Sequence, residues 1–133
     1  MTSLVQIFEA LADENRLRII NLLVLVPDLT VADLVFVLDM PQTRVSRHLG
    51  YLKARGLTQS ERRGTWMHYR TAPLLESGTA LRTSLQQLFT GNTTLLGDVE
   101  RLLEGLDEGK IAALKDAPAH EIEQVIQKCC RLN

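Results

Sequence analysis

The sequence predicts a mainly helical fold with one small β-hairpin. Apolar residues recur at helical spacing before residue 56 and again after residue 73. Between these regions lie two short segments rich in β-forming residues, 57–61 and 65–71, which Arg62-Arg63-Gly64 separates as the basic tip of a hairpin. The 133 residues suffice for one domain with a modest core, so these elements are expected to pack as a single unit.

Two helices are expected before residue 27. The first dozen residues are predicted to form a short amphipathic helix, whose apolar side carries Leu4, Ile7, Phe8 and Leu11. Asp13 is expected to cap a second helix, and Pro27 is expected to end it. The side chains expected to face inward from this second helix are Leu17, Ile20 and Leu23 or Val24.

A third and a fourth helix are expected next, joined by a tight turn. Thr30-Val31-Ala32-Asp33 has the spacing of a capping box and precedes an apolar run, which predicts a helix from about Thr30 to Asp39. The fourth helix is predicted from Pro41 or Gln42 to Arg55, because Gly56 supplies a stop. Its buried side repeats at i, i+4 and i+7 with Val45, Leu49 and Leu52.

Beyond Pro73 the pattern is helical again. Its apolar positions are Leu81, Leu85, Leu88 and Phe89, then Val99, Leu102, Leu103 and Leu106. The glycines at positions 78, 91, 97, 105 and 109 are expected to break this region into pieces. A last helix is predicted from Ala119 to about Cys130, with Ile122, Val125 and Ile126 on one side.

Charge is distributed unevenly along the chain, although its formal net value is only −1. Residues 41–70 carry a net charge of +6 and the remainder −7. The cations of the basic segment are Arg44, Arg47, Lys53, Arg55, Arg62, Arg63 and Arg70, against one anion, Glu61. Such asymmetry is typical of a polyanion-binding face on an acidic body. A basic face that is merely solvated is the alternative.

Two short helices joined by a tight turn and followed by a hairpin are the element order of a winged helix-turn-helix. In that fold the second helix enters the DNA major groove, where each base pair displays its own donor and acceptor pattern. The apolar side of the fourth helix anchors it to the body. The residues on or near its other side are Gln42, Thr43, Arg44, Ser46, Arg47 and His48.

These side chains suit DNA recognition. Gln and Arg make bidentate contacts to adenine and guanine, whereas Ser, Thr and Lys commonly hold phosphates. Lys53 and the hairpin residues Arg62, Arg63 and Thr65 are further candidates, the hairpin lying against the backbone or the minor groove. Arg44 and Arg47 are the first choices for base or phosphate contacts. For each residue taken alone, a solvated surface role is the alternative.

Three segments resemble the ArsR/SmtB family of metalloregulators. Residues 11–19 (LADENRLRI) are similar to the family's opening signature, 43–57 (TRVSRHLGYLKARGL) to its recognition helix and 62–70 (RRGTWMHYR) to its wing. The resemblance covers roughly residues 4–90. It implies a homodimer built from the first helix and the long helix after the wing, acting as a repressor that an inducer releases from a double-stranded DNA operator. It also implies that residues 1–90 form the DNA-binding and dimerisation core, with 91–133 a helical extension of the same domain.

The usual sensor residues of that family are absent. Members that sense metals from the third helix carry Cys-x-Cys-Asp-Leu there, whereas this chain has Thr30 and Ala32 at the cysteine positions. Thr30 and Asp33 are better explained as capping residues. The family's other common site uses Asp and His on the dimer helix, but no histidine lies between Leu74 and Ala119. Pro41 replaces the serine that usually caps the recognition helix.

Cys129 and Cys130 are the remaining thiol pair. Some relatives resembling this chain respond to trivalent arsenic through vicinal cysteines near the C-terminus, so As(III) or Sb(III) is the candidate inducer, bound at Cys129 and Cys130. Consecutive helical residues project about 100° apart, so chelation requires a frayed helix end. The third ligand would come from the partner chain, a small thiol or solvent. Incidental tail cysteines and thiol oxidation are the alternatives.

Several other functions fit the sequence poorly. Two adjacent cysteines cannot form a disulfide that joins distant parts of the fold. The chain shows neither a membrane-spanning apolar run nor a signal peptide. We therefore expect a cytoplasmic protein without a membrane partner. No nucleophile, base and orienting group can be assembled, so no enzyme is expected. His120 and Glu123 have a spacing that could bind zinc, although an exposed helix face explains them better. A winged-helix protein–protein adaptor is the rival from another class.

Overall fold

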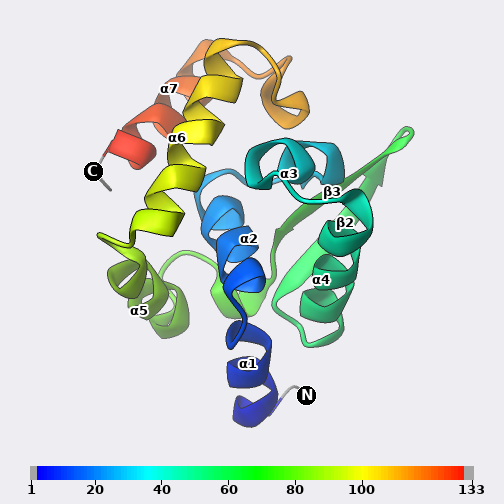
Figure 1. Ribbon diagram of the computed structural model, residues 1–133, viewed down its shortest axis with the longest axis vertical. Coiled ribbons are helices and arrows are strands. Elements are labelled where there is room, and N and C mark those ends of the chain that lie inside the picture. Colours follow the sequence, from blue (N-terminus) through cyan, green and yellow to red (C-terminus); the bar gives the residue numbers. More distant parts are fainter. Residues whose placement is uncertain (1–2, 131–133) are drawn as a thin grey trace.

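The computed structural model describes residues 3–130, apart from the side chain of Cys130. The chain order is α1 (Leu4–Leu11), α2 (Glu14–Leu25), β1 (Leu29–Thr30), α3 (Val31–Leu38), α4 (Gln42–Ala54), β2 (Thr58–Arg63), β3 (Trp66–Thr71), the 3-10 turn η1 (Pro73–Leu75), α5 (Ala80–Phe89), α6 (Thr93–Asp107), the 3-10 turn η2 (Ala112–Leu114) and α7 (Ala119–Cys130). Helix α2 lies centrally, between α3, α4 and the sheet on one side and α5, α6 and α7 on the other (Figure 1). The predicted mainly helical fold with a small hairpin is confirmed.

The first two helices begin at local capping residues. Ser3 and Gln6 form a capping box at the start of α1. The side chain of Asp13 accepts the N–H of Arg16 at 3.0 Å, which confirms Asp13 as the cap of α2. Helix α2 ends at Leu25, shortly before Pro27, because residues next to proline avoid the helical conformation.

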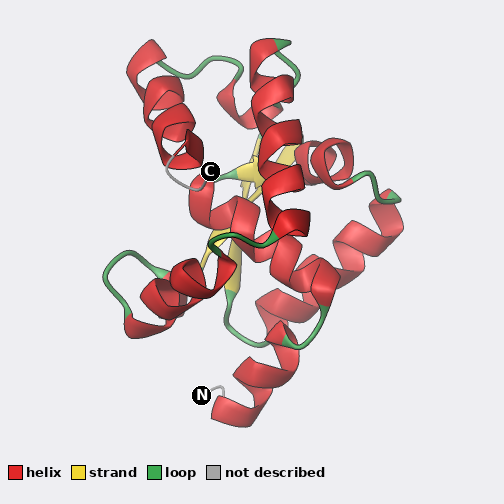
Figure 2. Ribbon diagram, turned by 60° about the vertical axis from the view of Figure 1, so that its left-hand side comes forward, coloured by secondary structure: helices red, strands yellow, loops and turns green. Residues whose placement is uncertain are grey.

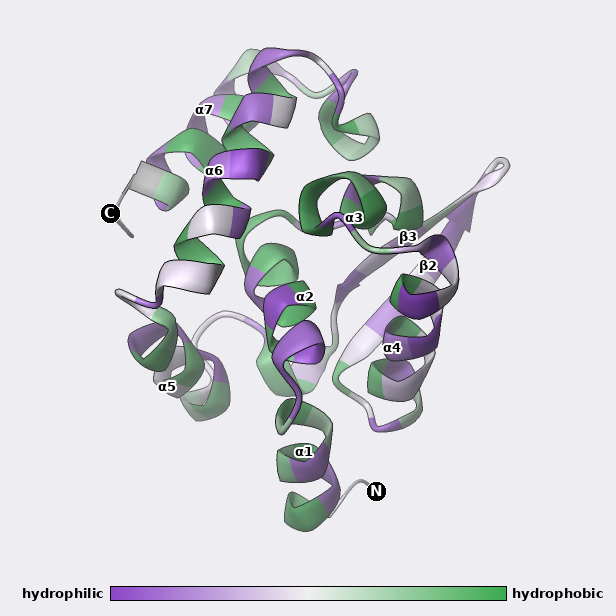
Figure 3. Cartoon of the chain, viewed as in Figure 1, coloured by the Kyte–Doolittle hydropathy of each residue, from purple (hydrophilic) through white to green (hydrophobic). Residues whose placement is uncertain are grey.

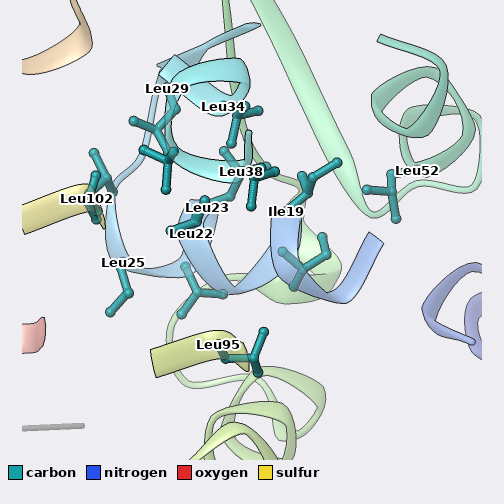
Figure 4. Packing of buried hydrophobic residues seen from close by; sticks show 14 of the residues in the cluster. Ile19, Leu22, Leu23, Leu25, Leu29, Leu34, Leu38, Leu52, Leu95 and Leu102 are labelled. Carbon is teal, nitrogen blue, oxygen red and sulfur yellow. The ribbon is translucent and has the colours of Figure 1, made fainter. Parts of the chain in front are cut away.

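Helix α2 is the centre of the hydrophobic core. Ile19, Ile20 and Leu22 are fully buried, and leucines of α3, α4 and α6 surround them (Figure 4). The prediction that Ile20, Leu23 and Val24 face inward is confirmed, whereas Leu17 is only partly buried. One core therefore holds the helices on both sides of α2 together.

Helix α1 does not bury the apolar side that the sequence predicts. Ile7 and Leu11 are buried, but Leu4 and Phe8 are 72% and 62% exposed. The reason is visible in Figure 1, where α1 extends away from the body and leaves its N-terminal turn uncovered. The predicted short amphipathic helix is present, and the chain itself covers only part of its apolar side.

The segment from α3 to α4 follows its sequence signals closely. Thr30 and Asp33 form the predicted capping box, with the N–H of Asp33 donating to the Thr30 hydroxyl at 3.1 Å. Asp39 adopts the left-handed conformation, with φ of 53°, and turns the chain into α4. Pro41 stands at the N-cap of α4 without a side-chain hydrogen bond, because proline offers no capping oxygen in its side chain.

The hairpin differs from the predicted one in its turn. Arg62 and Arg63 belong to strand β2, and the two-residue turn consists of Gly64 and Thr65, since Arg63 pairs with Trp66. Gly64 has φ of 62°, the conformation that a two-residue hairpin turn requires at its first position. A short strand that the sequence did not reveal, β1, pairs with β3, and the sheet order is β1-β3-β2.

The helices after the hairpin are longer than the glycines suggested. Gly97 and Gly105 lie inside α6 and do not break it. At Gly105 a Cβ would lie 2.8 Å from side-chain atoms of both Ile111 and Phe36, so this glycine permits close packing. The predicted last helix is confirmed at the same bounds as α7, with Val125 buried and Ile126 40% exposed.

Polar contacts attach the helices after the hairpin to the body, among them those of Arg18 and Asp33. Arg18 of α2 forms a bidentate ion pair with the buried Asp98 of α6, at 2.9 Å from Nε and 2.8 Å from Nη2. Asp33 of α3 accepts the N–H groups of Ala112 and Ala113 at 2.7 and 3.1 Å, which holds η2. Figure 2 shows that helices make up most of the chain and that the sheet among them is small. Within residues 3–130, no helix combines the length and the apolar character needed to span a membrane.

Candidate nucleic-acid interface

The outward side of α4 is polar and open to solvent. Val45, Leu49 and Leu52 are fully buried, as the sequence predicts, so helical geometry turns the remaining positions outward. The exposed side chains of this face are Gln42, Thr43, Arg44, Ser46 and Arg47. Figure 3 shows the resulting hydrophilic colour along α4 and along the adjacent strand β2. Helix α4 therefore presents the residue types that the sequence assigned to DNA contacts.

His48 lies at the inner edge of this face and is partly buried. Burial lowers the pKa of its imidazole, and the charges of Arg16, Arg44 and Arg47 lower it further, while Asp13 acts in the opposite direction. The lowered pKa favours the neutral ring near pH 7, so His48 adds hydrogen-bonding groups rather than charge to the α4 face.

The two strands of the wing, β2 and β3, divide the basic residues between their faces. Side chains alternate along a strand, so Arg62 shares a face with Ser60, whereas Arg63 shares the other with Glu61. The ammonium group of Lys53 in α4 donates to the Ser60 hydroxyl at 2.7 Å. Arg62 and Lys53 therefore lie on the α4 side of the wing, and the exposed Thr65 lies at its tip.

The other face of the wing is occupied by an ion-pair cluster. Arg63 Nη2 lies 3.3 Å from an oxygen of Asp28 and 3.2 Å from one of Glu61. Arg70 binds the same two carboxylates, at 2.6 Å from Asp28 and 3.4 Å from Glu61. Asp28 also anchors the wing through its carbonyl oxygen, which accepts a hydrogen bond from Nδ1 of His68 at 2.7 Å. DNA contact by Arg63 stays a prediction, since its guanidinium is engaged on this face.

Asp28 is the residue that sequence reasoning missed. It follows Pro27 and has φ of 66°, a turn conformation that aspartate tolerates better than most residues. The Pro-Asp pair could have signalled the turn. Its partners could not have been found, because Arg70 lies 42 residues away in the sequence.

The cations of the basic segment are therefore not equivalent. Arg63 and Arg70 are neutralised by Asp28 and Glu61, and Arg55 stacks on the ring of Tyr51 at 3.5 Å from its centroid. Among the described residues, the cations of this segment that neither pair with a carboxylate nor stack on a ring are Arg44, Arg47, Lys53 and Arg62. All four lie on α4 or on the wing face beside it.

Comparisons with known proteins identify relatives of this chain. A family model described as "Bacterial regulatory protein, arsR family" matches residues 13–60, which run from the cap of α2 into β2. The arsenic resistance transcriptional regulator ArsR2 of Pseudomonas putida is 33% identical over 101 residues, covering 76% of this chain and 86% of that relative. The chain belongs to the ArsR family.

Other ArsR-family relatives match over a shorter stretch. The arsenical resistance operon repressor of Escherichia coli is 45% identical over 69 residues, which is 52% of this chain and 59% of the repressor. The chain thus spans about three fifths of that relative. Among solved structures, HlyU from Vibrio cholerae has a TM-score of 0.55 at 27% identity, covering 64% of this chain and 86% of HlyU. The winged helix-turn-helix expected of an ArsR-family regulator is therefore present.

The two cysteines of the expected thiol site, Cys129 and Cys130, are the last residues of α7. Cys129 is fully buried in the last turn of α7, and the side chain of Cys130 lies outside the described residues. The frayed helix end that chelation requires is not seen at Cys129, which lies within α7. Within residues 3–130 no group of three His, Cys, Asp or Glu side chains is placed to hold a metal ion.

The remaining candidate ligands are accounted for by their surroundings. Thr30 is buried and caps α3, and Ala32 is exposed, so the third-helix positions hold no ligand. His120 and Glu123 are both exposed on α7, as expected of a solvated helix face.

Proposed function

We propose that this protein is a homodimeric, DNA-binding transcriptional repressor that reads an operator with α4 and the wing. The observation that carries the proposal is the exposed polar face of α4, with Arg44 and Arg47 outside any ion pair of the described residues, beside Lys53 and Arg62. A helix of this kind fits the major groove, and flanking cations bind phosphates. Two such helices would occupy successive major grooves about 34 Å apart.

The uncovered apolar side chains support a dimer. Leu4, Val5 and Phe8 of α1 are 72%, 66% and 62% exposed, and Leu88 of α5 is 75% exposed. Helices α1 and α5 lie at the same end of the molecule (Figure 1). Single exposed apolar residues are ordinary, but three on one short helix indicate a surface that a second copy covers.

Direct titration tests the DNA assignment. An operator is selected from random double-stranded DNA, and its affinity is measured by fluorescence anisotropy over a series of salt concentrations. Arg47→Ala and Arg62→Ala are each expected to weaken binding and to reduce the slope of log K against log salt by about one per lost phosphate contact. Lys110→Ala, which removes an exposed cation just after α6, is the matched control and is expected to bind like wild type. Unchanged affinity and slope in both arginine variants would refute the assignment.

For the inducer we propose trivalent arsenic or antimony bound at Cys129 and Cys130. The printed names of the P. putida and E. coli relatives concern arsenic resistance, which supports this class of ion. Because Cys129 is buried, binding requires the end of α7 to unpack. Helix α7 lines a cavity of about 450 Å³ together with Asp28 and Arg63 of the ion-pair cluster. Unpacking of α7 would therefore disturb the ion-pair cluster of the wing, and the displaced wing would favour release of the operator.

Operator release against a panel of ions and oxidants tests the inducer. Arsenite and antimonite are expected to release wild type but not Cys129→Ser/Cys130→Ser, whereas zinc and cadmium leave both bound. The melting temperature of the double variant is measured first, because Cys129 belongs to the core. Release by arsenite that persists in the double variant excludes the thiol site. Release by peroxide alone, with oxidised thiols in the mass spectrum, favours the thiol-redox alternative.

A further inference from the structure

Arg16 attaches the end of α1 to the rest of the molecule. The last carbonyl groups of a helix lack partners within it. Arg16 bonds two of these carbonyl groups: its Nε donates to the oxygen of Ala10 at 2.6 Å, and its Nη2 donates at 3.2 Å to that of Glu9, which also accepts the N–H of Ala12. A positive charge is also favourable at a helix C-terminus. The guanidinium of Arg16 therefore holds the end of α1, together with the buried Ile7, Ala10 and Leu11.

The same guanidinium stacks on the recognition helix. Its Cζ lies 4.2 Å from the centroid of the Tyr51 ring in α4. The side chain of Arg16 is only 15% exposed, and a shielded cation interacts with an aromatic ring more strongly than an exposed one. A planar guanidinium can bond two carbonyls in its own plane while its face rests on a ring, which an ammonium group cannot do.

We propose that Arg16 is a positioning residue that fixes the direction of α1 relative to α4. The proposal rests on the proposed function, in which α1 contributes to the dimer and α4 enters the major groove. In such a dimer the angle between α1 and α4 sets the separation of the two recognition helices. Operator half-sites are spaced by that separation, so Arg16 acts on DNA affinity without touching DNA.

Arg55 offers a matched comparison. Its Cζ lies 3.5 Å from the same Tyr51 ring, but Arg55 is the C-cap of α4 itself. Arg16→Met and Arg55→Met both remove a guanidinium from Tyr51 and keep an aliphatic side chain. Only the first variant also releases α1. A difference between the two variants therefore reports the link between helices rather than the loss of a stacked cation.

The first test varies the operator. Wild type and variants are titrated with the selected operator and with versions whose half-sites are moved apart by one or two base pairs. Arg16→Met is expected to lose about tenfold in affinity for the natural spacing, the size of a typical coupling between sites. Its affinity is expected to depend less on spacing than that of wild type, while Arg55→Met keeps the wild-type dependence. An Arg16→Met variant with the wild-type spacing dependence overturns the proposal.

The second test needs no DNA. Spin labels are placed at Ser46→Cys, an exposed position of α4, in a background with Cys129 and Cys130 replaced by alanine. The distribution of label–label distances in the dimer is expected to be narrow in the reference protein and in Arg55→Met, and broad in Arg16→Met. An equally narrow distribution in Arg16→Met overturns the proposal. Absence of any dipolar coupling in the reference protein contradicts the dimer instead, so the two failures are distinguishable.

Tyr51 variants keep the test decisive if Arg16→Met folds poorly. Tyr51→Phe retains the ring, so it is expected to match wild type in both measurements. Tyr51→Leu removes the ring from α4 and leaves the bonds of Arg16 to Glu9 and Ala10 in place. It is expected to broaden the distance distribution as Arg16→Met does. A narrow distribution in Tyr51→Leu would show that the stack does not position α1.

Discussion

His48 combines partial burial with a place on the proposed DNA face, so its titration acts on stability. Burial and three neighbouring arginines lower the pKa of the imidazole in the folded protein. The unfolded chain then binds the proton more readily, and the stability present above the ordinary pKa of about 6.5 is lost as pH falls below it. We expect the free energy of unfolding of wild type to fall more steeply than that of His48→Gln between about pH 7.5 and pH 5.5. Urea unfolding at each pH measures both, and parallel curves would contradict the assignment.

Asp33 is a buried carboxylate whose partners come from two parts of the chain. It accepts the N–H of Thr30 at 3.0 Å and those of Ala112 and Ala113. Asp33→Asn turns one acceptor into a donor that faces a partly buried N–H, so we expect a loss of about 1–3 kcal/mol in unfolding free energy. Asp39→Asn is the matched control, because Asp39 is exposed and asparagine tolerates its left-handed conformation. Denaturant unfolding of both variants decides the point, and equal losses would mean that the partners of Asp33 contribute little.

At the scale of elements, α6 contains two glycines with opposite surroundings. A Cβ at Gly105 would lie 2.8 Å from Ile111 and Phe36, whereas one at Gly97 meets nothing within 4 Å. Alanine is the better helix former, so Gly97→Ala is expected to stabilise the protein by about 0.5–1 kcal/mol. Gly105→Ala is expected to destabilise it by about 1–3 kcal/mol through overpacking. Thermal unfolding of the two variants tests whether one is stabilised and the other destabilised. A stabilised Gly105→Ala would show that Ile111 and Phe36 can move to make room for the added methyl group.

The sequence predicted the elements that depend on capping residues or on the spacing of nearby apolar residues. It did not predict elements that depend on pairing between distant parts of the chain. The capping residues Asp13 and Thr30 and the buried side of α4 depend on spacing within one or two helical turns. Strand β1 has two residues and exists through its pairing with β3, some forty positions later, so no local pattern announces it. Periodicity located the apolar side of α1, but it could not tell which of these residues the chain itself covers, and Leu4 and Phe8 are exposed.

At the scale of the whole molecule, the basic segment is less positive toward DNA than its sequence indicates. Its net charge is +6 by composition, but Asp28 comes from outside the segment and shares Arg63 and Arg70 with Glu61. The ion pairs join the wing to the turn at Asp28, on the face of the wing opposite Arg62. The sequence could predict the charge asymmetry, whereas the division of cations between contact and anchoring follows from tertiary pairing.

The salt dependence of operator binding measures how many cations of the basic segment contact DNA. If Arg44, Arg47, Lys53 and Arg62 of each protomer contact phosphates, a dimer makes about eight contacts, and the slope of log K against log salt is expected to be no steeper than about −7. If all seven cations of the segment contacted DNA, the slope would approach about −13. Asp28→Asn removes one of the two carboxylates that Arg63 and Arg70 share, while Glu61 still pairs with both. We expect an unchanged slope and a weaker affinity, because the wing loses its anchor. A wild-type slope near −13 would show that the cluster opens on DNA and that Arg63 is a contact residue after all.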